Sequence, residues 1–157
     1  MKNWLKLIIA IAIPLAVGFT SSIFTMEGVN GWYKTINRPS WNPPNYIFGP
    51  VWTTLYILMG ISLYLVWVSN RPKAKKNRAF ILFTIQLILN FFWSYIFFSM
   101  HEIGWAFVEI VALWLFILLT IFSFASINKK AAWLLVPYIS WVSFAAILNY
   151  TIWILNK

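Results

Sequence analysis

Five long apolar segments constrain the fold of this chain more than any other feature. A helix that crosses the hydrocarbon core of a bilayer needs about 20 predominantly apolar residues at about 1.5 Å each. Only 10% of the residues are charged, against about 25% in a typical soluble domain. We therefore predict an all-α membrane protein, a bundle of five transmembrane helices that span approximately Trp4–Thr25, Tyr46–Val68, Ala79–Met100, Gly104–Ala125 and Ala131–Leu155.

The connections between these segments indicate a single domain over residues 1–157. Only the first connection, Met26–Asn45, is long, and the short ones force neighbouring helices to run antiparallel. Lys2 and Lys6 before an apolar run are typical of a secretion signal. The run is nevertheless long enough to span a bilayer and lacks a good cleavage site, so we expect a retained helix.

Charge predicts orientation rather than a nucleic-acid partner. The net charge is +9, but the basic residues lie between apolar runs, which argues against nucleic-acid binding. Because cytoplasmic loops are enriched in Lys and Arg, we expect a cell-membrane protein with its N-terminus in the cytoplasm and its C-terminus outside. Lys34, Arg38 and Lys157 lie on the outer side, and the cytoplasmic side collects Lys2, Lys6, Arg71, Lys73, Lys75, Lys76, Arg78, Lys129 and Lys130.

Few side chains are available for ordinary enzyme chemistry. The chain has no cysteine and no aspartate, and its only acids are Glu27, Glu102 and Glu109. No nucleophile–base pair, metal cluster or phosphate-binding loop is present, which argues against hydrolytic or hydride chemistry and predicts no metal site. The single histidine, His101, falls in a predicted turn, where a solvated side chain is favoured over a haem ligand.

The stretch "SWNPPNYIFGPVWTTLY", residues 40–56, combines rigid and aromatic residues at the entry to the second helix. Its prolines fix φ and remove backbone donors, which gives a stiff, non-helical path before the helix. Phe48, Trp52 and Tyr56 recur at four-residue spacing and share one helix face. Trp41 and Tyr46 fit either an interfacial aromatic belt or a ligand-binding role.

Two further helices present matching faces. Gln86, Asn90 and Trp93 share one stripe, and buried amides in hydrocarbon must be paired. They fit either a pocket wall or interhelical hydrogen bonds. Helix four adds Trp105 and Glu109, and helix five aligns Tyr138, Trp141, Ala145, Leu148 and Asn149. Together these faces predict an aromatic pocket for flat, hydrophobic guests, with a few amides that fix orientation.

Three stretches closely resemble signatures of the tryptophan-rich sensory protein family, which includes the translocator protein, or peripheral benzodiazepine receptor. They are "SWNPPNYIFGPVWTTLY", "QLILNFFWS" and "PYISWVSFAAILNY". The resemblance implies a five-helix membrane bundle, commonly a homodimer, that binds porphyrins and isoquinoline carboxamide or benzodiazepine drugs. Bacterial relatives are described as promoting light- and oxygen-dependent breakdown of protoporphyrin IX, and Trp52 and Trp141 match the tryptophans implicated in it.

The resemblance also implies wall positions. Trp93, Trp105, Ala145 and Leu148 match the pocket wall, and Ser22, Thr25, Phe48, Gly49 and Val51 align with further parts of it. Adding residues of the first loop and the polar faces, we predict Trp52 and Trp141 as catalytic and a ligand-binding set of Ser22, Thr25, Trp32, Trp41, Pro44, Phe48, Gly49, Val51, Trp52, Tyr56, Gln86, Asn90, Trp93, Trp105, Glu109, Tyr138, Trp141, Ala145 and Leu148.

One departure concerns sterols. The cholesterol-recognition pattern requires a basic residue within five intervening positions after its tyrosine. Leu148 and Tyr150 are in place, but Lys157 comes too late, which argues against cholesterol as a partner.

The sequence leaves three functions open. The chain could degrade porphyrin as a substrate, sense it as a ligand without turnover, or transport a small molecule with proton coupling at Glu109, the only acid within a span. No covalently bound cofactor is expected.

Overall fold

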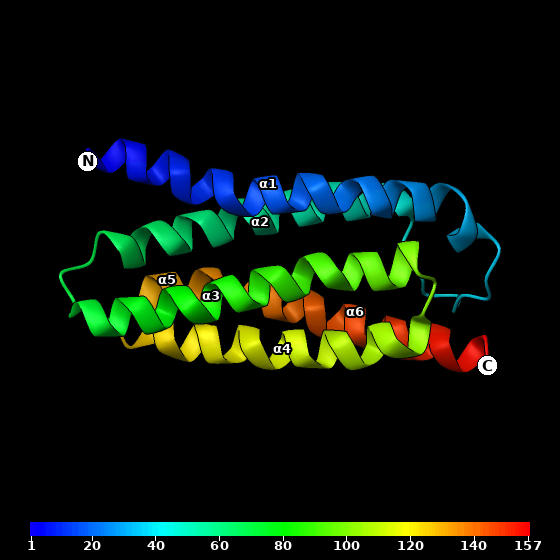
Figure 1. Cartoon of the computed structure of the whole chain (residues 1–157). Helices are drawn as coiled ribbons and strands as arrows, with labels where there is room; N and C mark the ends of the chain where they lie inside the picture. The colour runs from blue at the N-terminus through cyan, green and yellow to red at the C-terminus, as the bar shows by residue number, and fades with distance from the viewer.

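The computed structural model describes all residues 1–157 and confirms the predicted bundle (Figure 1). Five helical spans are long and apolar enough to cross a membrane. Two of the spans are each built from two consecutive elements. The order is α1 (Asn3–Asn30), the short 3₁₀ turn η1 (Trp32–Lys34), α2 (Asn45–Trp67), α3 (Lys73–Ser94), the π-helical turn η2 (Tyr95–Ser99), α4 (Ile103–Ala125), α5 (Lys129–Leu134) and α6 (Val136–Leu155).

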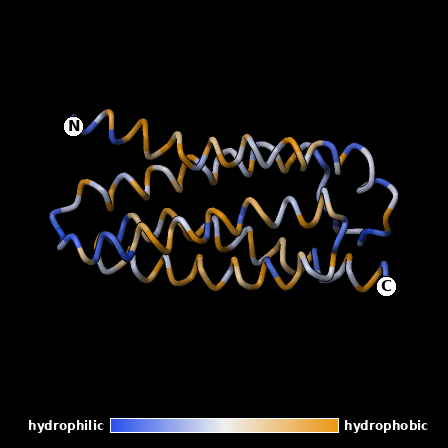
Figure 2. Tube along the Cα trace, viewed as in Figure 1, coloured by the Kyte–Doolittle hydropathy of each residue, from blue (hydrophilic) through white to orange (hydrophobic).

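The two ends of the bundle differ. The N-terminus, the α2–α3 connection and the α4–α5 connection lie at one end, and the long first loop, the α3–α4 turn and the C-terminus lie at the other (Figure 1). We call the end that carries the long first loop and the C-terminus the loop end. Hydrophilic residues concentrate at both ends, and the middle of the bundle is predominantly hydrophobic (Figure 2).

Large apolar side chains cover the outside of the bundle. Phe122 on α4 is 64% exposed and Trp133 on α5 is 72% exposed. In water such a surface would be costly, because burying apolar area is the main driving force of folding. Toward acyl chains the same surface carries no such penalty, so the exterior agrees with the membrane setting.

Element boundaries differ from the predictions at three places. Helix α1 continues to Asn30, so the first loop starts at Gly31 rather than at Met26. The third span ends in the π-helical turn η2 instead of a regular helix. The fifth span is interrupted at Leu135, between α5 and α6, because Pro137 in the first turn of α6 lacks a backbone donor.

Two glycines bring α1 and α2 into close contact. A Cβ added at Gly60 would lie 2.4 Å from the Cα of Ile11, and one added at Gly18 would lie 2.3 Å from Cε2 of Tyr56. Only a residue without a side chain permits these backbone and ring approaches. The Gly18–Tyr56 contact lies in the wall of the cavity described below, whereas Gly60 and Ile11 do not line it.

Candidate functional site

The main cavity of the bundle lies toward the loop end and has a volume of about 740 Å³. It is walled by the C-terminal half of α1, by η1, by the N-terminal half of α2, by the α3–η2 junction and by α6; 17 of its 27 lining residues are hydrophobic. Small-molecule pockets typically measure about 300–1,000 Å³ and are mostly apolar. The cavity thus has the size and lining of a binding site for a hydrophobic molecule.

The structure brings many of the predicted ligand-binding residues into this wall. Trp52 on α2 and Trp141 on α6 both line it. Phe48 contacts Trp141 edge-to-face at 6.0 Å between ring centroids, and Trp52 stands edge-on to Tyr138 at 6.3 Å. The predicted residues found in the wall are Ser22, Thr25, Phe48, Gly49, Trp52, Tyr56, Trp93, Trp141, Ala145 and Leu148.

No residue of α4 reaches the cavity. Trp105 is 68% exposed on the outside of that helix. Glu109 lies in the same helix, and both of its carboxylate oxygens are buried without a hydrogen-bond partner. The prediction that Trp105 and Glu109 bind the ligand is therefore wrong for the wall of this cavity, because α4 packs against α3 and α6 and does not border the cavity.

The first-loop residues of the predicted set also lie outside the main wall. Trp32 stacks on His101 with 4.3 Å between ring centroids, and Trp41 contacts Phe144 edge-to-face at 5.9 Å. Pro44 lines a separate cleft in the loop. Val51 on α2 packs against the hydrophobic core instead.

The remaining predicted residues form a buried polar chain next to the cavity. Tyr56 Oη donates to Asn90 Oδ1 at 2.7 Å, Asn90 Nδ2 donates to Tyr138 Oη at 2.9 Å, and Tyr138 Oη donates to Gln86 Oε1 at 2.7 Å. Of these four residues only Tyr56 lines the cavity. The amides therefore make the interhelical hydrogen bonds that were the alternative to a wall position, and they link α2, α3 and α6.

Two polar groups in the wall have no partner within the chain. Ser21 Oγ and Trp141 Nε1 are buried and make no hydrogen bond, and both residues line the cavity. An unsatisfied buried donor costs about 1–3 kcal/mol. These groups are therefore available to a guest that carries hydrogen-bond acceptors.

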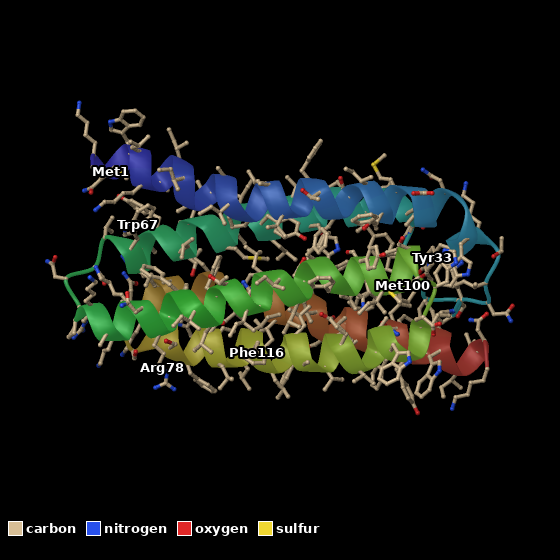
Figure 3. All side chains as sticks on the ribbon, viewed as in Figure 1. Met1, Tyr33, Trp67, Arg78, Met100 and Phe116 are labelled. Carbon is tan, nitrogen blue, oxygen red and sulfur yellow. The ribbon has the colours of Figure 1, made fainter.

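The first loop contributes one residue to the cavity wall at the loop end. Tyr33, which is only 2% exposed, lines the wall and donates from its hydroxyl to Asn42 Oδ1 at 2.6 Å. Burial raises the pKa of the Tyr33 phenol to about 12, although the neighbouring Arg38 charge and the Asn42 hydrogen bond both lower it. Tyr33 thus remains a neutral donor at physiological pH. Figure 3 shows it at the same end of the bundle as Met100.

The sequence analysis did not predict most of the residues that α1 and η2 contribute to the cavity wall. Helix α1 is apolar nearly all round and offers no stripe that would reveal an inward face. Tyr46 and Asn149 were recognised as aromatic or polar positions and do line the cavity. The other wall residues outside the predicted set are Leu15, Gly18, Phe19, Ser21, Met26, Val29, Asn30, Tyr33, Asn45, Thr53, Ser94, Phe97, Phe98, Phe144 and Ile152.

The titratable side chains do not gather into a metal-binding group, since no cluster of three or more His, Cys, Asp or Glu residues occurs. His101 is exposed in the α3–α4 turn, where it adopts a positive φ of 59°.

Comparison with known proteins agrees with this architecture. A family model described as the TspO/MBR family matches residues 10–154. The chain is 48% identical to the tryptophan-rich protein TspO of Chlorobaculum tepidum over 155 residues, which cover 99% of this chain and 98% of that protein. It is 39% identical to the translocator protein of Homo sapiens over 81% of this chain and 75% of that protein. It is 35% identical to the tryptophan-rich sensory protein of Cereibacter sphaeroides over 80% of this chain and 77% of that protein.

The match to the family model and the match to the Chlorobaculum tepidum protein extend over nearly the whole bundle, including every helix that lines the cavity. This chain therefore belongs to the TspO/MBR family.

Proposed function

We propose that the cavity binds porphyrins, with protoporphyrin IX as ligand or substrate. The observation that carries this proposal is the pair Trp52 and Trp141, which line one apolar cavity from two different helices. Stacking of aromatic rings contributes about 0.5–1.5 kcal/mol per well-placed pair beyond area burial. A flat tetrapyrrole could contact both indoles at once, and the unpaired Nε1 of Trp141 could donate to it.

We propose further that bound porphyrin is broken down in light. The ring absorbs light by itself, and molecular oxygen is the oxidant. An indole stacked on the excited ring can donate an electron or trap a radical, which would give Trp52 and Trp141 a catalytic role. No other chemistry is required of the protein, which agrees with a wall that contains no Asp, Glu, His, Lys, Arg or Cys residue.

The test is illumination of limiting purified protein with excess protoporphyrin IX. Loss of many equivalents of porphyrin absorbance per chain would mean turnover. Trp52→Phe and Trp141→Phe should keep binding and lose this activity, whereas Trp133→Phe, on the lipid-facing surface of α5, should behave as the parent chain. Undiminished loss in both cavity variants would refute the catalytic role.

The second candidate is a porphyrin sensor without turnover. It predicts stoichiometric quenching of indole fluorescence with no conversion in the same illumination experiment.

The third candidate is a proton-coupled transporter. It is favoured by Glu109, whose carboxylate oxygens are buried without partners inside a spanning helix. Uptake into vesicles driven by a pH gradient, and lost in Glu109→Gln, would support it.

We propose the cell membrane as the location, with the loop end outside. The nine basic residues expected on the cytoplasmic side belong to the N-terminal segment, the α2–α3 connection and the starts of α3 and α5, which share one end of the bundle (Figure 1). Figure 3 labels Met1 and Arg78 at this same end of the bundle.

We propose isoquinoline carboxamide or benzodiazepine drugs as further ligands of the same cavity. We propose a homodimer as the assembly.

A further inference from the structure

We propose that Arg38 and the polar cleft of the first loop bind the carboxylate edge of the ligand whose apolar body fills the main cavity. This inference rests on the proposed function and specifies its ligand class as planar, apolar acids that carry their carboxylates on one edge. Protoporphyrin IX has that form, because both propionates lie on the same side of its ring.

The cleft is polar where the main cavity is apolar. It is formed by the loop and the first residue of α2, and seven of its eight lining residues are not hydrophobic; they include Arg38, Asn37, Asn42 and Asn45. Asn45 lines both the cleft and the main cavity, so the two spaces adjoin at the start of α2. A single guest could therefore occupy both, with its polar edge at the loop.

Arg38 is the cation that joins these two spaces. Its guanidinium lies over the ring of Tyr33, 4.9 Å from the centroid, and Tyr33 is part of the main wall. The half-buried Arg38 side chain forms no ion pair within the chain. A guanidinium has five donors in a planar fork that matches a carboxylate, so it is the side chain best suited to bind one.

The other basic residues are in the wrong place for this role. Nine lie at the opposite end of the bundle, and only Lys34, Arg38 and Lys157 lie at the loop end. Lys157 lies over the ring of Trp153, 4.4 Å from the centroid, and Lys34 lines neither the cleft nor the cavity. Arg38 is thus the one basic side chain positioned near the cavity to pair with a carboxylate of the guest.

The start of α2 adds to the positive character of the cleft. Asn45 is the first residue of this 23-residue helix, and no side chain caps its N-terminus. The first-turn amide groups of a helix carry a partial positive charge that favours anions. They would support the carboxylate that Arg38 holds. The arrangement also fixes orientation, because a carboxylate directed the other way would enter hydrocarbon at high cost.

The experiment compares protoporphyrin IX with its dimethyl ester, which keeps the ring and lacks the charges. Affinities are measured by quenching of indole fluorescence in nanodiscs of uncharged lipid, for the parent chain, Arg38→Gln and Lys34→Gln. Arg38→Gln should weaken binding of the diacid about tenfold or more, since hydrogen bonds between charged groups are strong, and leave the diester unchanged. Lys34→Gln, which removes the same charge from the same loop, should change neither affinity.

The diester also reports whether each variant is folded, because it needs only the main cavity. The assignment of Arg38 would be overturned if Arg38→Gln lowered the affinities for the diacid and the diester equally. It would also be overturned if Lys34→Gln lowered the affinity for the diacid as much as Arg38→Gln does. Failure of the parent chain to bind either ligand would instead refute the proposed function, so the two failures are distinguishable.

Discussion

The indole Nε1 of Trp93 donates a 3.0 Å hydrogen bond to Oδ1 of Asn149, and both side chains lie in the cavity wall. Asn149 in turn donates from Nδ2 to the backbone oxygen of Ile103 at 2.9 Å. One amide therefore links α3, α4 and α6 at the level of the cavity. The site and the helix packing depend on the same polar contact.

Replacing Asn149 by Leu should destabilise the bundle by about 1–2 kcal/mol, because the Trp93 donor and the Ile103 carbonyl would both lose a buried partner. The measurement is thermal unfolding in detergent. Thr151→Val is the control, since Thr151 bonds only to the backbone of its own helix and is partly exposed. An equal loss of stability in Thr151→Val would show that the hydrogen bonds of Asn149 make no specific contribution.

Much of the fold could be predicted from the sequence. A helix that crosses the hydrocarbon core must have a certain length and an apolar composition, and both can be read directly from the sequence. The site was predicted in part. Trp93 and Trp105 look alike in sequence, yet Trp93 is in the wall and Trp105 faces outward. Their difference arises from the positions of whole helices around the cavity, and an apolar helix carries no periodic pattern that reveals which face is inside.

The contribution of α1 was hidden for a related reason. Its placement depends on the contacts of Gly18 with Tyr56 and of Gly60 with Ile11. These join residues more than 35 positions apart, and neither glycine forms part of a recognisable motif. The polar chain of Gln86, Asn90 and Tyr138 was similarly ambiguous, because amides inside a membrane bundle must be paired whether or not a ligand is present.

Two glycines of α2 should respond oppositely to alanine. A Cβ at Gly60 meets the backbone of Ile11, so Gly60→Ala should push α1 from α2 and cost about 1–3 kcal/mol. A Cβ at Gly49 meets no atom within 4 Å, so Gly49→Ala should be neutral or stabilise by up to about 1 kcal/mol through helix propensity. Thermal unfolding of the two variants side by side would decide, and equal destabilisation would contradict the α1–α2 packing described above.

A larger residue at Gly49 should act on the site instead of the fold. Gly49 lines the cavity, and Gly49→Leu would place its side chain in space that a ligand needs. We expect protoporphyrin affinity to fall about tenfold or more, equivalent to about 1.4 kcal/mol, with thermal stability retained. Retained affinity would mean that the porphyrin binds elsewhere.

The first loop is fastened to the end of α6. The backbone N–H of Asn37 donates to Asn156 Oδ1 at 2.9 Å, and Asn156 Nδ2 donates to the Asn37 carbonyl at 2.8 Å. Asn156→Ala removes both bonds, each worth about 0.5–1.5 kcal/mol. Ligand dissociation should then accelerate roughly tenfold in stopped-flow fluorescence. Asn70→Ala, an exposed asparagine at the opposite end, should leave the rate unchanged.

Alkaline pH should weaken the loop through Tyr33. Burial raises the pKa of its phenol from 10.0 to about 12, so the folded state holds this proton more tightly than the unfolded state does. Stability from this residue is therefore fully present below pH 10 and is lost as the pH rises from about 10 to about 12. Unfolding in detergent across this range should show a steeper loss for the parent chain than for Tyr33→Phe, which has no proton to lose. The two proteins differ only at residue 33, so the difference between their curves isolates Tyr33. Parallel curves would mean that the phenol is not buried under the loop.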